Sequence, residues 1–152
     1  MEVRRKVILK QKILFVCVHN SARSQMAEEI LRQMAGDRFE VESAGLEPGT
    51  LNPLVVMLLK EDGINIEYKR TQAVKDILQK KRRYDYVITV CDESSRERCP
   101  IFPGEANRIH WDFPDPSQFQ GTAEEKLTQT RQVKDLIKRK IQDWLIHAAS
   151  AC

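Results

Sequence analysis

Residues 12–35 read KILFVCVHNSARSQMAEEILRQMA, and this stretch decides the fold. Its opening apolar run predicts a buried strand at 12–17, and the pattern after the loop predicts a helix at 22–35. The residues between them, CVHNSARS at 17–24, are mostly small and polar. A loop between a strand and a helix presents several backbone N–H groups to one point, where the helix dipole adds partial positive charge. The stretch therefore predicts a cradle for a small anion.

The rest of the chain alternates in the same way between short apolar runs and longer helical patterns. We expect further strands at 39–43, 85–90 and 107–111, and further helices at 53–62, 72–82 and 122–148. Thr122 with Glu125 forms a capping box, and Asn52 precedes Pro53 at another helix start. Strands separated by such helices predict a single-domain, three-layer α/β/α fold with a parallel sheet. In such sheets ligands bind beyond the carboxyl ends of the strands.

The composition limits the number of domains and the kinds of partner. With 152 residues and 41% apolar content, we expect one domain at 11–148, between a basic N-terminal extension at 1–10 and a frayed end at 149–152. The net charge of +3 argues for neither nucleic acid nor a membrane as partner. The basic run at 80–83 falls where a helix is expected to end, which is an ordinary place for cations.

The cysteines direct attention to chemistry. They are Cys17, Cys91, Cys99 and Cys152. Lys10 and Lys12 interrupt the apolar stretch near the N-terminus, so we expect no secretory signal peptide and a cytoplasmic protein. In a reducing cytosol, cysteines are more often buried, catalytic or metal-bound than paired in structural disulfides.

Cys17 and Arg23 are the candidate reactive groups of the loop. The field that attracts an anion should also favour the thiolate form of Cys17, with Ser21 or Ser24 as hydrogen-bond donors to the sulfur. The Arg23 guanidinium is a planar fork that can hold two oxygens of a phosphate-like anion. Asn20 tolerates the left-handed backbone that a tight anion nest needs. The alternative is a buried strand-end cysteine and a solvated arginine, which the placement of the loop disfavours.

Several motifs of the chain occur together in one known superfamily. They are Cys17, five residues, Arg23 and Ser24, then QMAE, with Ser43-Ala44-Gly45 after the second strand and Asp115-Pro116 far downstream. From about residue 12 to 145 the chain resembles the low-molecular-weight tyrosine phosphatase superfamily, and more specifically the thioredoxin-coupled arsenate reductases built on that fold. The resemblance implies a four-stranded parallel sheet flanked by helices. We expect no cofactor and no bound metal.

The resemblance also assigns roles to residues. It implies Cys17 as the nucleophile, Arg23 as the anion clamp and Asp115 as the general acid. It implies that the substrate is bound by the loop residues Val18, His19, Asn20, Ser21, Ala22, Arg23 and Ser24. Many members of both groups carry a second cysteine just before the loop arginine. Here that residue is Ala22, so an in-loop disulfide cannot form.

The resemblance further implies a relay of three thiols that reduces arsenate to arsenite. Cys17 attacks arsenic while Asp115 protonates the departing oxygen, and Cys91 then attacks Cys17 so that arsenite leaves. Cys99 next attacks Cys91, and thioredoxin or a similar dithiol protein reduces the resulting disulfide. Neighbouring parallel strands lie about 4.8 Å apart, so Cys17 and Cys91 come within bonding reach if their strands are adjacent.

A phosphatase of the same superfamily is the main alternative. It would use the nucleophile, the clamp and the acid alone, without the later cysteines. Asp112 competes with Asp115 for the role of the acid, but the Asp-Pro match favours Asp115. Phosphatases of this superfamily usually follow Asp-Pro with aromatic residues that wall a slot for a phenyl ring. Ser117 and Gln118 stand there instead, which suits a small inorganic anion.

Other interpretations concern the later cysteines. Cys91 and Cys99 could be one core residue and one incidental surface thiol. They could also join His110 in a zinc site, although no close ligand pair supports zinc. A further alternative is a non-enzymatic oxyanion-binding or redox-sensing module. Cys152, at the extreme end of the chain, is treated as incidental.

Overall fold

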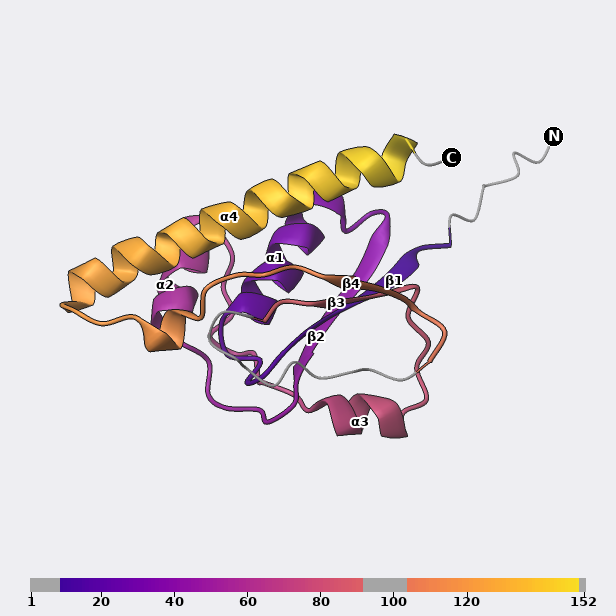
Figure 1. Cartoon of the computed structure of the whole chain (residues 1–152), viewed down its shortest axis with the longest axis horizontal. Coiled ribbons are helices and arrows are strands. Elements are labelled where there is room, and N and C mark those ends of the chain that lie inside the picture. The colour runs from indigo at the N-terminus through magenta and orange to yellow at the C-terminus, as the bar shows by residue number, and fades with distance from the viewer. Residues whose placement is uncertain (1–8, 92–103, 151–152) are drawn as a thin grey trace.

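A four-stranded parallel sheet forms the centre of the protein. The computed structural model describes residues 9–91 and 104–150. β1 (Gln11–Cys17) pairs with β2 (Phe39–Gly45) on one side and with β3 (Tyr86–Thr89) on the other. β4 (Asn107–His110) pairs with β3, so the order is β2-β1-β3-β4 and every pairing is parallel (Figure 1). The predicted sheet is confirmed, and the strands that end near positions 17 and 91 are direct neighbours.

Helices cover both faces of the sheet, as the three-layer prediction requires (Figure 1). α1 (Arg23–Ala35), α2 (Pro53–Glu61) and α4 (Ala123–Ser150) pack on one face. The short α3 (Val74–Gln79) packs on the other. Among the helices of residues 9–91 and 104–150, none has both the length and the apolar character needed to cross a membrane.

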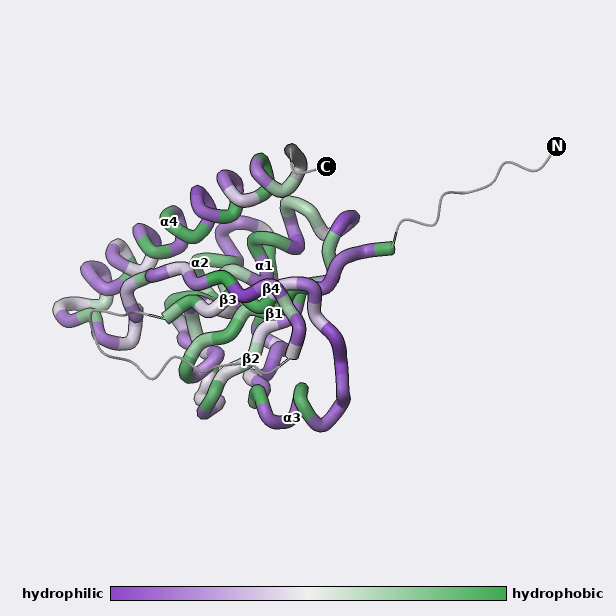
Figure 2. The backbone as a smooth tube through the Cα atoms, turned by 45° about the vertical axis from the view of Figure 1, so that its right-hand side comes forward, coloured by the Kyte–Doolittle hydropathy of each residue, from purple (hydrophilic) through white to green (hydrophobic). Residues whose placement is uncertain are grey.

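Alternation of side chains along β1 divides the core into two clusters. Phe15 and Cys17 belong to the larger cluster, beneath α1 and α4. Leu14 and Val16 point the other way and pack with residues of α3. β1 is therefore covered on both sides, as expected for the strands of an α/β/α fold. Figure 2 shows the hydrophobic residues gathered in the strands at the centre of the molecule.

The predicted helix caps are present. The side chain of Asn52 accepts a hydrogen bond from the amide of Leu54 at 2.9 Å, at the start of α2. At the start of α4, Thr122 Oγ1 accepts from the amide of Glu125 at 3.1 Å, and Glu125 Oε1 accepts from the amide of Thr122 at 3.4 Å. The capping box predicted from sequence is therefore formed in both directions.

The third helix is shorter than predicted. The sequence pattern indicated a helix at 72–82, but α3 spans only Val74–Gln79. Its N-cap residue, Ala73, makes no side-chain hydrogen bond, and Lys81 adopts a φ of 52°, which a right-handed helix cannot include. The periodic pattern of side chains does not reveal either of these backbone features.

Candidate active site

The loop from Cys17 to Ser24 is held from outside by the segment 46–52. The carbonyls of Cys17, Val18, His19 and Ser21 accept hydrogen bonds of 3.1, 2.8, 3.0 and 2.9 Å from backbone amides of that segment. The N–H and C=O of a peptide unit point in opposite directions, so carbonyls bonded outward leave amides facing inward. The loop therefore has the backbone arrangement of an anion nest.

The tight course of the loop depends on Asn20 and Gly45. Asn20 has a φ of 54°, which confirms the left-handed backbone expected at this residue. Gly45 is the register partner of Cys17 in β2. A Cβ at position 45 would lie 2.8 Å from backbone atoms of Val18, His19 and Asn20. β2 can pass this close to the loop only because position 45 has no side chain.

α1 begins at the end of the loop and directs its first amides toward it. Ala22 occupies the N-cap position and makes no side-chain hydrogen bond. Helices usually satisfy one of their first N–H groups with a Ser, Thr, Asp or Asn side chain at this position. Since Ala22 has no such oxygen, the first-turn amides and the positive end of the helix dipole are left to act on a bound anion.

The sulfur of Cys17 receives two polar contacts inside the loop. Its Sγ lies 2.9 Å from Ser24 Oγ and accepts a hydrogen bond from the amide of Asn20 at 3.1 Å. Of the two serines considered from sequence, Ser24 is therefore the one that the structure brings to the sulfur. Cys17 is 2% exposed, so little of this residue is open to solvent. This geometry favours a small anion over a bulky group.

Arg23 and Asp115 form a buried pair. Arg23 Nη2 lies 3.5 Å from Asp115 Oδ2, and the two side chains are 3% and 10% exposed. Arg23 Nη1 also donates to the carbonyl of Phe113 at 3.2 Å. Asp115 Oδ1 accepts from the amide of Ser117 at 2.9 Å, which caps the 3₁₀ helix η2 (Pro116–Gln118). The predicted clamp and the predicted acid thus lie side by side, although they are far apart in sequence.

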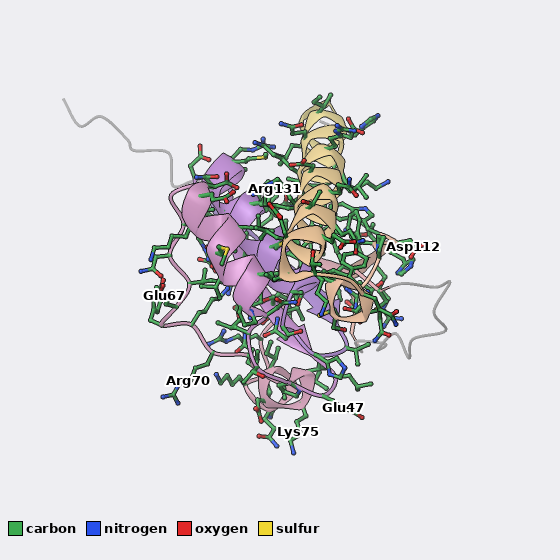
Figure 3. All side chains as sticks on the ribbon, turned by 90° about the vertical axis from the view of Figure 1, so that its left-hand side faces the viewer. Glu47, Glu67, Arg70, Lys75, Asp112 and Arg131 are labelled. Carbon is green, nitrogen blue, oxygen red and sulfur yellow. The ribbon has the colours of Figure 1, made fainter. Side chains whose placement is uncertain are left out.

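The competing acid, Asp112, lies elsewhere. Its side chain is exposed at the surface (Figure 3), whereas Asp115 is buried beside the Arg23 guanidinium. The geometry favours Asp115 over Asp112 as the proton donor, and the role itself stays a prediction. His19 is also exposed, and its Nδ1 lies 3.0 Å from the carbonyl of Glu47. The ring of His19 is therefore bonded to the segment outside the loop.

Cys91 follows the strand next to β1. Val16 pairs with Thr89, and the amide of Val90 donates to the carbonyl of Val16 at 2.9 Å, so β3 stays beside β1 up to Val90. In this register Val90 lies opposite Cys17. Cys91 is the next residue and is buried. Neighbouring strands lie about 4.8 Å apart and each residue adds about 3.3 Å along a strand, so the Cα atoms of Cys17 and Cys91 should be roughly 6 Å apart. This distance is within the range for a disulfide.

The direction expected for the Cys91 side chain sets a condition for a disulfide with Cys17. Cys17 and Val90 belong to the same core cluster, so strict alternation would turn Cys91 to the opposite face of the sheet. A bond between the two sulfurs therefore requires the backbone after Val90 to leave strand geometry. β3 ends at Thr89, which permits this departure. Cys99 and Cys152 lie outside the described residues, so the predictions that involve them, including the zinc site, are not tested.

A series of buried polar side chains continues behind the sulfur. Asn20 Nδ2 donates to Ser24 Oγ and to Ser43 Oγ, each at 2.9 Å. Ser43 Oγ donates to Glu28 Oε1 at 2.6 Å, and Glu28 Oε2 lies 2.5 Å from Lys69 Nζ. The sequence analysis included Asn20 and Ser24 in the site but missed the other three. Ser43 and Glu28 lie within the two short motifs already noted, and that was the available signal.

Known proteins of similar sequence now place the chain in a family. Residues 12–151 match the low molecular weight phosphotyrosine protein phosphatase family. The chain belongs to this family. The predicted superfamily is therefore confirmed, together with its parallel sheet and the placement of the loop between β1 and α1.

Within this phosphatase family, the chain is similar to arsenate reductases. An arsenate reductase of Oceanobacillus iheyensis is 40% identical over 134 residues, which are 88% of this chain and 94% of that protein. The crystal structure of an arsenate reductase from Archaeoglobus fulgidus superposes with a TM-score of 0.65 at 30% identity, covering 86% of this chain and 98% of that one. A thioredoxin-dependent arsenate reductase of Corynebacterium glutamicum gives a TM-score of 0.58 at 30% identity, covering 90% and 64%.

Proposed function

We propose that this protein reduces arsenate to arsenite, with Cys17 as the nucleophile. The observation that carries the proposal is the position of the Cys17 sulfur, which lies between Ser24 Oγ and the Asn20 amide inside an anion nest. The thiolate is the form in which a cysteine acts as a nucleophile. The similarity to arsenate reductases at 40% identity supports arsenate as the anion.

The first step joins sulfur to arsenic. The loop amides and the Arg23 guanidinium hold the oxygens of arsenate, and the Cys17 thiolate attacks the arsenic atom. An As–O bond breaks, and Asp115 supplies a proton so that the oxygen leaves as water. The contact of 3.5 Å between Arg23 and Asp115 supports these two roles, because it keeps the proton donor beside the group that binds the oxygens.

The second step reduces arsenic. The Cys91 thiolate attacks the Cys17 sulfur, a Cys17–Cys91 disulfide forms, and the As–S bond breaks with its electron pair remaining on arsenic. Arsenic(V) thereby becomes arsenic(III) and leaves as arsenite, while two thiols are oxidised. The pairing of β1 with β3 supports Cys91 as the partner, because it brings the chain at position 91 beside the end of β1.

The last step restores Cys17. Cys99 attacks Cys91 of the disulfide, a Cys91–Cys99 disulfide forms, and Cys17 is released as a thiol. A dithiol protein such as thioredoxin then supplies two electrons and reduces that disulfide. The similarity to a thioredoxin-dependent arsenate reductase supports this reductant. Such a cycle belongs in the cytoplasm, where thioredoxin keeps thiols reduced, and it needs no cofactor because cysteines carry every electron.

Phosphatase activity is the second candidate, and the family match favours it specifically. A phosphatase needs the loop, Arg23 and Asp115 but neither Cys91 nor Cys99. The short 3₁₀ helix η2 carries Ser117 and Gln118 directly after Asp115-Pro116, at the positions where phosphatases of this superfamily usually carry aromatic residues. Phosphorus(V) also cannot accept the electrons of a thiol pair, so a phosphorylated Cys17 could only be hydrolysed.

One pair of assays separates the two activities. Arsenite release is measured with arsenate, thioredoxin, thioredoxin reductase and NADPH, and phosphate release is measured with an aryl phosphate. Cys91→Ser should abolish arsenite release, and Cys152→Ser, as a matched control, should leave it intact. Vigorous cleavage of the aryl phosphate that survives Cys91→Ser, without arsenite release by the native chain, would support the phosphatase instead.

A further inference from the structure

We propose that the Asp115 carboxylate competes with the bound oxyanion for the Arg23 guanidinium, and that Asp115 takes up a proton when the oxyanion displaces it. Oxyanion binding thereby supplies Asp115 with the proton that it later donates. The inference rests on the proposed function only in the roles given to Arg23 and Asp115. It is tested with sulfate, which binds without being turned over.

The Arg23 guanidinium is turned toward the segment that carries the acid. Its Nη2 lies 3.5 Å from Asp115 Oδ2, and its Nη1 donates to the carbonyl of Phe113 at 3.2 Å. A guanidinium holds two oxygens of an anion through a pair of N–H groups on one edge. The two edges that can do so, Nε with Nη2 and Nη1 with Nη2, both include Nη2. An oxyanion held by either edge therefore contacts the nitrogen that is paired with Asp115.

The Asp115 carboxylate depends on Arg23 for its counter-ion. Its Oδ1 accepts from the amide of Ser117 at 2.9 Å, and within residues 9–91 and 104–150 its only ion pair is the one with Arg23. The Asp115 side chain is 10% exposed, so water screens its charge poorly. An ionised carboxylate that is buried beside an anion and has lost its cation is strongly disfavoured, and protonation removes its charge.

The other charged groups around Asp115 do not replace Arg23. α4 packs against η2, and the charged residues of its first turn are Glu124, Glu125 and Lys126. Among the described residues, none of these three forms an ion pair with Asp115. Asp112 lies on the same segment as Asp115 but is exposed. Cys17 and His19 of the loop also titrate, so an experiment must separate their protons from that of Asp115.

The exchange at Arg23 balances in protons and charge. The oxyanion binds the guanidinium, the contact between Arg23 and Asp115 breaks, and one proton passes from the solvent to the Asp115 carboxylate. With arsenate, the same proton then passes to the oxygen that leaves as water. Asp115 is thereby ionised again and can pair with Arg23 once the site is free. A carboxylate that is paired with a guanidinium can in this way still serve as a proton donor.

The test is sulfate binding to the full chain carrying Cys17→Ser, because serine removes the thiol that titrates in the loop. Sulfate keeps its double charge near neutral pH, so a proton taken up on binding belongs to the protein. Isothermal titration calorimetry in two buffers of different ionisation enthalpy counts that proton. We expect about one proton per sulfate, so that Kd rises about tenfold per pH unit from about pH 6 to about pH 8. This measurement requires no substitution of Asp115.

Two asparagine substitutions, each added to Cys17→Ser, assign the proton. Asp115→Asn can still cap η2 but has no carboxylate to displace. It should bind sulfate about tenfold or more tightly than the parent chain at about pH 8, and it should lose the proton uptake. Asp112→Asn is the matched control, since it removes the same charge from an exposed position and should leave both Kd and uptake unchanged. A contribution from His19 is common to all three chains and cancels in the difference.

Several results would overturn the proposal. They are a proton uptake that Asp115→Asn leaves unchanged, a sulfate affinity that Asp115→Asn does not improve, and sulfate binding to the Cys17→Ser chain without proton uptake. A complete lack of sulfate binding would also overturn it, because the competition requires a bound oxyanion. None of these results depends on arsenate turnover, so failure of the proposed function, seen as absent arsenite release, is recognised separately.

Discussion

Gly45→Ala should displace the loop that follows Cys17, because Gly45 of β2 packs directly against its backbone. The added Cβ would lie 2.8 Å from backbone atoms of Val18, His19 and Asn20, and ordinary contact begins at 3.4 Å. Backbone cannot rotate away as a side chain can, so β2 or the loop must move by about 0.6 Å, the difference between these two distances. Overpacking of this kind costs about 1–3 kcal/mol. For a domain of this size that lowers Tm by about 2–12 °C.

Activity should fall further than stability alone explains. A misplacement of about 1 Å at a reacting group can cost about 100-fold in rate, so a shift of roughly half that size should slow arsenate turnover about tenfold. Gly49→Ala is the control, because a Cβ there has His19 Cβ as its nearest neighbour at 3.8 Å, an ordinary contact. Thermal unfolding and arsenite release are measured on both variants. Native Tm and native turnover in Gly45→Ala would refute the close approach of β2 to the loop.

Three further substitutions test other parts of the site. Asp115→Asn should slow arsenate attack by about 10²–10⁴-fold in single-turnover assays, because the amide can still cap η2 but supplies no acid proton; an unchanged rate would remove Asp115 from the mechanism. Arg23→Lys should raise KM for arsenate about tenfold or more, since an ammonium cannot hold two oxygens, and an unaltered KM would contradict the clamp. Burial alone would raise the pKa of Glu29, but Lys69 and Arg32 outweigh it and lower that pKa below its ordinary 4.5. The lowered pKa contributes stability that is fully present above pH 4.5 and is lost as the pH falls through the folded-state pKa. Glu29→Gln should therefore weaken the pH dependence of the free energy of unfolding in urea below pH 4.5. An unchanged pH dependence would contradict the ion pairs.

The strand, loop and helix of residues 12–35 could be predicted because each has a local cause. The apolar run gives β1, the periodic pattern gives α1, and the small polar residues between them give the nest. The left-handed backbone at Asn20 could be anticipated from its residue type alone. The short length of α3 could not be predicted, because the helix ends at Gln79 and the left-handed backbone at Lys81, two residues later, is not one that a lysine favours.

The buried polar contacts that Glu28 makes with Ser43 and Lys69 could not be predicted from sequence. Ser43 contacts Glu28 across 15 positions, and Lys69 contacts Glu28 across 41. Both contacts exist only because β2 pairs with β1 and the segment after α2 returns to α1. The pairing of Arg23 with Asp115 was accessible only through the family resemblance, since 92 positions separate the two residues and no local pattern joins them.

The central claim is that the Cys17 sulfur takes up arsenic and that Cys91 resolves the adduct. Disulfide mapping of the Cys99→Ser chain after a single turnover with arsenate tests it most directly. The relay predicts one equivalent of arsenite per chain and a Cys17–Cys91 disulfide that persists because the third thiol is missing. Arsenite released in that amount while Cys17 remains alkylatable, or an unchanged yield when Cys91 is also replaced by serine, would contradict the relay.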